Sequence, residues 1–137
     1  MSMVLDASLT LTWFFADERT KATDALLDQT TQTGAIVPPL WRLEIANAFL
    51  SAIRRNRIDE TFRDRALTQL ARLPITIDPD CDPQTWTTTI RLADRLNLTI
   101  YDATYLELAQ RHALPLATLD TQLRQAAQSI GLITPGI

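Results

Sequence analysis

The sequence predicts an α/β fold in which a mostly parallel sheet is covered by helices on both faces. Short apolar runs alternate along the chain with longer segments of helical periodicity, and no internal repeat or low-complexity stretch interrupts them. Strands of parallel sheets are buried on both faces, so they read as continuous apolar runs. A chain of 137 residues, 46% of them hydrophobic, is long enough for one such domain.

Five short apolar runs are the candidate strands. Residues 3–5, 35–37 and 115–118 are the clearest, residues 75–77 are a fourth candidate and residues 132–134 a fifth. None of them shows the sustained alternation of apolar and polar residues that is typical of a sheet with one solvent-exposed face. They therefore fit a sheet that is buried between two layers of helices.

Helical segments fill the intervals between these runs. Gly34 and Gly131 stand where helices are expected to end, and Asp59 is a suitable N-cap. The expected helices are residues 10–15, 19–33, 40–55, 59–73, 83–96, 102–112 and 121–130.

Composition excludes several kinds of site. Cys81 is the only cysteine and His112 the only histidine, which argues against disulfides, thiolate-rich metal sites, zinc hydrolase motifs and Ser-His-Asp triads. The net charge of −3 argues against a pure nucleic-acid-binding module, but not against an enzyme that holds cations in an acidic pocket. With no signal-peptide pattern and no apolar run long enough to span a bilayer, we expect a cytoplasmic protein without a membrane partner.

Three aspartates are expected to meet at one edge of the sheet. Asp6 directly follows the first strand, Asp120 follows the strand at residues 115–118, and Asp102 opens a helix. Parallel strands share one carboxyl end, where ligands of such sheets bind. Each aspartate could instead cap the helix that it precedes. Two carboxylates about 4 Å apart repel by about 4 kcal/mol at an effective dielectric of 20, so a cluster of them calls for protons or cations.

Glu44 is the fourth acid of interest. It lies in the expected helix 40–55, which is apolar on almost every side and is therefore expected to be buried. Glu44, Asn47 and Ser51 form one narrow polar stripe. A buried glutamate needs a partner, either a distant arginine or a cation shared with the three aspartates. Oxygen ligands without histidine or cysteine suit Mg²⁺ or Mn²⁺, which activate water for attack on phosphodiesters.

At these residues the sequence resembles a PIN domain, and in particular the VapC-type toxins of bacterial type II toxin–antitoxin pairs. Order and spacing agree from about residue 3 to residue 134, nearly the whole chain. The stretches that carry the resemblance are VLDAS (residues 4–8), LEIANA (43–48), YDATYLELA (101–109) and ATLDTQL (117–123).

The resemblance implies a three-layer α/β/α sandwich with a four- or five-stranded parallel sheet, and a single PIN-like nuclease domain over residues 1–137. It implies hydrolysis of RNA by a Mg²⁺- or Mn²⁺-dependent endoribonuclease. It also implies a homodimer that a cognate small antitoxin silences, and it leaves the RNA target open. The implied catalytic and metal-binding residues are Asp6, Glu44, Asp102 and Asp120, and the implied supporting residues are Ser8, Asn47 and Thr118.

Several other residues allow two interpretations. Arg54, Arg55 and Arg57 could contact RNA phosphates beside the pocket, or could form a solvated helix end in which arginines complement the helix dipole. The aromatic residues 13–15 could stack on bases, although core or dimer contacts are the simpler interpretation. Tyr101 and Tyr105 flank Asp102, and we expect them to pack at the site entrance.

Two alternative functions remain open at this point. A receiver-type phosphorylation domain has a similar sheet, and Asp78 is placed as its phosphoacceptor. However, Asp6 lacks the acidic neighbour of such a domain, and the only lysine, Lys21, is in the wrong place for it. A non-catalytic interaction module is the second alternative, and it would leave Glu44 without a purpose.

Overall fold

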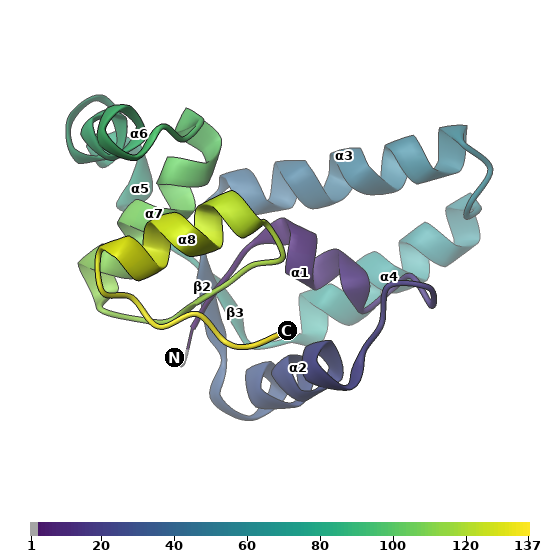
Figure 1. Cartoon of the computed structure of the whole chain (residues 1–137). Coiled ribbons are helices and arrows are strands. Elements are labelled where there is room, and N and C mark those ends of the chain that lie inside the picture. Colours follow the sequence, from purple (N-terminus) through teal and green to yellow (C-terminus); the bar gives the residue numbers. More distant parts are fainter. Residues whose placement is uncertain (1–2) are drawn as a thin grey trace.

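The computed structural model describes residues 3–137 and shows a four-stranded parallel sheet between two layers of helices (Figure 1). The strand order is β3-β2-β1-β4, and all pairs are parallel. This confirms the predicted α/β fold class. The strands are β1 (Val4–Leu5), β2 (Ala35–Val37), β3 (Ile75–Ile77) and β4 (Leu116–Ala117).

Two of the strands span the predicted residues, and the fifth predicted strand is absent. β2 and β3 match the predictions, whereas β1 and β4 are shorter than the apolar runs that contain them. Within the described chain, residues 132–134 form no strand. They contribute the Ile133 carbonyl, which accepts a hydrogen bond from the Leu116 amide at 2.9 Å, so the predicted fifth strand is wrong.

The helices form the two outer layers. The connections from β1 to β2 and from β2 to β3 carry α1 (Ala7–Thr12), α2 (Lys21–Thr33), α3 (Leu40–Arg54) and α4 (Glu60–Arg72). The return from β3 to β4 carries α5 (Cys81–Gln84), the π-helix η1 (Thr85–Thr89), α6 (Ile90–Leu96) and α7 (Ile100–His112), and α8 (Thr121–Ser129) follows β4. Right-handed crossovers place the first four helices on one face and the return helices on the other, as Figure 1 shows.

Two helical segments differ from the prediction. The helix expected at residues 10–15 begins earlier, at Ala7, because Asp6 occupies the N-cap position directly after β1. The single helix expected at residues 83–96 is divided by η1. Four of the five residues of η1 are threonines, whose branched side chains crowd the preceding turn and weaken a regular α-helix.

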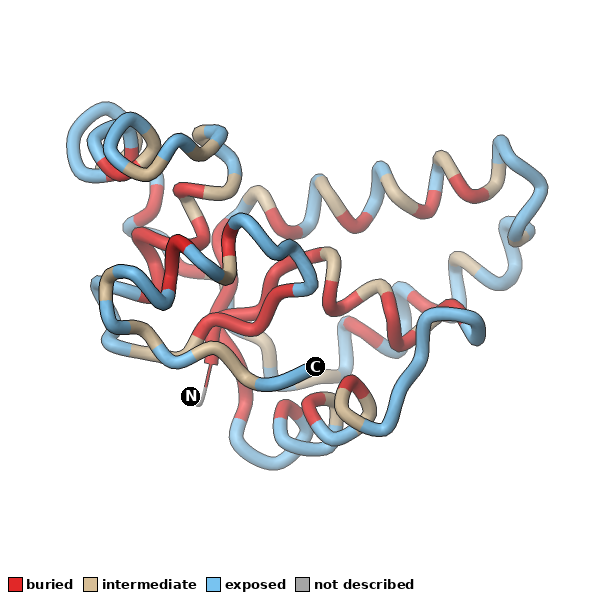
Figure 2. Tube along the Cα trace, viewed as in Figure 1, coloured by how far each residue is buried: buried red, intermediate tan, exposed pale blue. Residues whose placement is uncertain are grey.

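The outer side of α3 is exposed, so the expectation that this helix is buried all round is wrong. Ile45 and Phe49 lie in the core, on the side that contacts α1. Leu43 and Leu50 are 70% and 37% exposed on the other side. Figure 2 shows the same division along α3, which extends beyond the sheet with α4. A helix in an outer layer has only one face covered.

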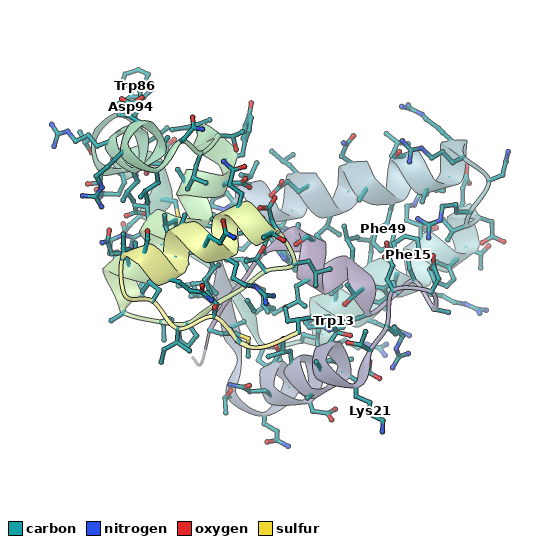
Figure 3. The ribbon with its side chains drawn as sticks, viewed as in Figure 1. Trp13, Phe15, Lys21, Phe49, Trp86 and Asp94 are labelled. Atoms are coloured by element: carbon teal, nitrogen blue, oxygen red, sulfur yellow. The ribbon has the colours of Figure 1, made fainter. Side chains whose placement is uncertain are left out.

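The aromatic residues near α1 pack into the core. Trp13 is buried and donates its indole N–H to the Thr23 carbonyl at 2.9 Å. Phe15 is also buried, with its ring 6.1 Å from that of Phe49 (Figure 3). The base-stacking interpretation is therefore wrong for Trp13 and Phe15. Among the helices of residues 3–137, none has the length and apolarity needed to cross a membrane.

Candidate active site

The sheet and the N-terminal turns of two helices bring the four predicted acids close enough for their charges to affect one another. Asp6 follows β1, Asp120 follows β4 after two intervening residues, and Glu44 and Asp102 lie in the first two turns of α3 and α7. The carboxylates of Asp6 and Asp102 both act to raise the pKa of Glu44. Asp120 and Asp6 do the same to Asp102. Residues from four distant segments of the chain therefore repel one another here.

Asp6 is the most enclosed of the four acids. Its residue is 6% exposed, and its Oδ2 atom accepts hydrogen bonds from the hydroxyls of Thr118 at 2.6 Å and Ser8 at 2.9 Å. Burial raises the pKa of Asp6, and these two hydrogen bonds only partly oppose the increase. Asp6 occupies an N-cap position, but its side chain makes no cap hydrogen bond. Its carboxylate therefore bonds to the side chains of Ser8 and Thr118 and does not cap α1.

Glu44 is half-buried and is held by a tyrosine. The hydroxyl of Tyr105 donates to Oε1 of Glu44 at 2.6 Å, and Tyr105 itself is fully buried. Burial raises the pKa of Glu44, as does repulsion from the nearby carboxylates, while the bond from Tyr105 opposes the increase. No arginine pairs with Glu44 within the described chain, so the salt-bridge alternative is wrong.

Sequence analysis did not identify this role of Tyr105. Two signals could have indicated it. Tyr105 lies three residues after Asp102 in one helix, so the two side chains share a face. A buried tyrosine hydroxyl also usually finds a hydrogen-bond partner.

Asp102 and Asp120 differ in how they relate to their helices. Thr99, not Asp102, caps α7, and its hydroxyl accepts a hydrogen bond from the Asp102 amide at 3.1 Å. Burial raises the pKa of Asp102, and the charge of Asp120 adds to that effect. Asp120 is a true N-cap, because its Oδ1 accepts from the Leu123 amide at 2.9 Å. The capping alternative therefore applies to Asp120 alone.

Two of the three predicted supporting residues connect these acids. Thr118 donates to Asp6, and its hydroxyl accepts from the Asp120 amide at 3.0 Å. Ser8 donates to Asp6 and accepts from the Leu119 amide at 3.3 Å. The third, Asn47, is exposed on α3 and bonds to none of the four acids. Its supporting role stays a prediction.

The donor set fits a hard divalent cation in its chemistry but is not preformed. Carboxylates and hydroxyls are the groups that Mg²⁺ and Mn²⁺ prefer, and a cation would relieve the repulsion described above. As the side chains stand, residues 3–137 contain no group of three His, Cys, Asp or Glu side chains placed to hold one ion. Glu44 is turned to Tyr105 and Asp120 to the start of α8. Each of these bonds uses one oxygen of its carboxylate, Oε1 of Glu44 and Oδ1 of Asp120.

A second polar cluster lies outside this site, at the end of β3. Asp78 is 2% exposed, and Arg111 donates to both of its oxygens, at 2.8 and 3.3 Å. The thiol of Cys81 donates to it at 3.2 Å, and the ring of His112 lies 3.1 Å from it. Burial acts to raise the pKa of Asp78, but these bonds hold it well below its usual range. An aspartate enclosed in this way does not suit a phosphoacceptor, which argues against the receiver-type alternative.

Comparisons with known proteins identify the family and the fold of this chain. The family model of the PIN domain matches residues 3–129. A curated relative, Ribonuclease VapC3 from Pyrobaculum aerophilum, is 27% identical over 135 residues, which cover 98% of this chain and 100% of the relative.

Two crystal structures share the fold. That of PAE2754 from Pyrobaculum aerophilum has a TM-score of 0.71 at 24% identity, covering 98% of this chain and 89% of that one. That of FitAcB from Neisseria gonorrhoeae has a TM-score of 0.65 at 14% identity, covering 98% and 96%.

Proposed function

The chain belongs to the PIN domain family, and from that membership we propose that it is a Mg²⁺- or Mn²⁺-dependent endoribonuclease. The observation that carries the proposal is that four acids follow β1 and β4 or lie in the first turns of α3 and α7, where burial and neighbouring carboxylates raise the pKa of Glu44 and of Asp102. Clustered carboxylates destabilise a fold. Their presence is explained if they hold a cation that assists hydrolysis of a phosphodiester. The name of the relative, Ribonuclease VapC3, supports RNA as the substrate.

The proposed site residues are of two kinds, those that hold the ion and those that orient them. Asp6, Glu44, Asp102 and Asp120 would hold the ion, which when bound polarises the scissile phosphate and lowers the pKa of the attacking water. Ser8 and Thr118 fix the orientation of Asp6, and Tyr105 fixes that of Glu44. A carboxylate with a raised pKa, such as Glu44, is suited to accept a proton from that water.

We further propose that residues 1–137 form one domain that acts as the toxin of a toxin–antitoxin pair in the cytoplasm. The cognate small antitoxin would silence it by binding, as the VapC resemblance implies. The exposed Leu43 and Leu50 on α3 support a homodimer, because large apolar side chains at the surface of a small protein often mark an interface.

Asparagine substitutions test the site. Asp6→Asn and Asp102→Asn should each lower the rate of RNA cleavage at least about 100-fold, since each removes a charged ligand. Adding Mg²⁺ should raise the melting temperature of the wild type and raise it less in either variant. The control is Asp28→Asn, because Asp28 is exposed on α2, away from the site. Undiminished cleavage by Asp6→Asn or Asp102→Asn would reject the assigned site.

The same variants test the toxin role in cells. Expression of the wild type should stop growth, and co-expression of a small protein encoded beside it should restore growth. Asp6→Asn should be harmless at equal abundance. Growth arrest by Asp6→Asn would instead support the non-catalytic interaction module.

A further inference from the structure

A groove between α1 and α3 starts beside the proposed active site. It encloses about 340 Å³. At one end it is lined by Ser8, which bonds to Asp6, and by Leu119, which precedes Asp120. At the other end it is lined by Arg55 and Arg57. The groove thus joins an acidic site to a basic helix end.

The face of α3 that lines the groove begins at a site residue. Glu44, Ala48, Ser51 and Arg55 recur at helical spacing, so they lie along one side of the helix, and the last three line the groove. Arg55 comes 11 residues after Glu44, which at 1.5 Å per residue is about 16 Å along the helix axis. The rise per nucleotide along a duplex axis is about 3.4 Å, and an unpaired strand can be more extended. The distance therefore spans no more than about five nucleotides of one strand.

The arginines at this end of α3 are not equivalent. Arg57 forms an ion pair with Asp17 at 3.2 Å, and its guanidinium lies 4.6 Å from the centre of the Phe15 ring. Arg55 forms no ion pair within residues 3–137. Arg54 is also exposed but does not line the groove. Arg55 is thus the arginine in the groove whose charge remains available.

The floor of the groove is apolar, and one acid stands at its wall. Leu11, Phe15 and Ala52 contribute the apolar surface, and Glu18 contributes the negative charge. Phe15 and Ala52 are buried, so this floor offers no ring face for base stacking, but the riboses and base edges of an unpaired strand can lie against it, whereas a duplex hides its bases in the stack. The lining therefore suits a single strand better than a double helix.

We propose that this groove binds single-stranded RNA on one side of the scissile phosphate, with Arg55 as its phosphate contact. The proposal rests on the proposed nuclease function and names the surface and the residue that hold the substrate beside that site. Arg57 also lines the groove, but its guanidinium is held by the ion pair with Asp17 and by the Phe15 ring. The groove accounts for which of the three neighbouring arginines contacts RNA.

Binding measurements with two adjacent variants test the proposal. A fluorescent 12-nucleotide single-stranded RNA is titrated with protein in EDTA, so that no cleavage is needed for the readout. Arg55→Ala should weaken binding about 5-fold or more, and should make the slope of log K against log salt less steep by about 0.7, the contribution of one phosphate contact on a single strand. The control Arg54→Ala removes the same charge one residue away and should leave this slope unchanged.

Two further measurements separate RNA from a protein occupant. Glu18→Gln should strengthen binding of the RNA, because it removes a repelling charge from the groove, whereas a basic protein segment would lose affinity. A hairpin RNA of the same composition should bind more weakly than the single strand. Equal slopes for Arg55→Ala and Arg54→Ala, equal affinity for the hairpin, or no binding by the wild type would each overturn the proposal.

Failure of this proposal and failure of the nuclease function give different results. If the wild type binds RNA in the expected pattern but does not cleave it, the groove proposal stands and the nuclease proposal is rejected. If the wild type cleaves RNA and its KM equals that of Arg55→Ala, the nuclease proposal stands and the groove proposal is rejected.

Discussion

Tyr105 shows how a residue without charge can set the properties of an acidic site. Its hydroxyl is the one group that the structure places on Glu44 with a hydrogen bond, at 2.6 Å within residues 3–137. Burial and, to a smaller extent, the surrounding carboxylates raise the pKa of Glu44, and this bond counteracts them. The repulsion also makes Tyr105 harder to ionise, since burial and then the charge of Glu44 raise its pKa. The hydroxyl therefore stays a donor across the physiological range.

Tyr105→Phe should lower RNA cleavage about 10- to 100-fold, the usual effect of losing a partner that orients a metal ligand. Without the bond, the pKa of Glu44 should rise, so the acidic limb of the pH–rate profile should move to higher pH. The measurement is cleavage rate against pH at saturating Mg²⁺. Tyr101→Phe is the matched control, because Tyr101 is 60% exposed. A profile identical to that of the wild type would show that the bond has no catalytic role.

The individual acids were predictable from sequence, but their partners were not. Asp6 and Asp120 follow apolar runs that became β1 and β4, so strand position alone placed them at one edge. The hydroxyl of Thr118 meets Asp6 across 112 positions of the chain. A contact of that kind depends on how two strands pair, and no local pattern records it.

At the scale of elements, α7 is anchored at both ends. Its first turn carries Asp102, and near its last turn Arg111 bonds to Asp78 after β3 and to Glu107 on its own helix. Glu107 and Asp78 are both buried, and both raise the pKa of Arg111. The guanidinium thus stays charged and ties α7 to the edge of the sheet. This contact fixes the helix that presents Asp102 and Tyr105.

Asp78→Asn should destabilise the fold by about 3 kcal/mol near neutral pH, because it removes one partner of a buried ion pair. The folded pKa of Asp78 is lowered, so its stabilising effect is present above the ordinary value of 3.8 and is lost as pH falls through the folded pKa. The difference between wild type and variant should therefore shrink in acid. Urea unfolding at a series of pH values measures it.

Asp80→Asn is the matched control for that series, because Asp80 is exposed two residues away and bonds to Asp78 only through its amide. It should unfold like the wild type. A stability difference between Asp78→Asn and wild type that persists unchanged in strong acid would mean that shape, not charge, is what Asp78 contributes.

The elements that sequence analysis predicted best are those with strong local signals. β2 lies between the glycine that ends α2 and two prolines, and α4 starts at Asp59, whose side chain caps it as predicted. Sequence analysis did not predict the π-helical segment η1 or the exposed side of α3. The exposed side of α3 depends on how helices pack in the outer layer, and η1 depends on crowding by its threonines; the periodicity of apolar residues reveals neither.

At the scale of the whole molecule, α3 and α4 extend beyond the sheet, and one side of α3 is left without a cover (Figure 1). Leu43 and Leu50 lie on that side, two turns apart. Trp86 is 89% exposed at the outer end of the segment α5–η1–α6, which packs on α7 (Figure 3). Of these apolar groups, the two leucines share one regular helix with a proposed site residue.

If α3 forms the proposed homodimer contact, Leu50→Glu should convert dimer to monomer in sedimentation experiments at micromolar concentration, because it places a charge in an apolar interface. Leu43→Glu should do the same. Ile133→Glu is the control, since Ile133 is as exposed as Leu43, at 69% against 70%. A monomeric wild type, or a Leu50→Glu variant that stays dimeric, would count against this interface.

The short link between β4 and α8 has a consequence for how this chain can vary. Surface loops usually accept added residues at little cost. Here Thr118 touches Asp6, the Asp120 amide touches Thr118, and Asp120 starts a helix. An insertion of one residue would misplace a carboxylate and remove a helix cap in the same event. We therefore expect engineered length changes to be rejected between β4 and α8, although this link is a surface loop.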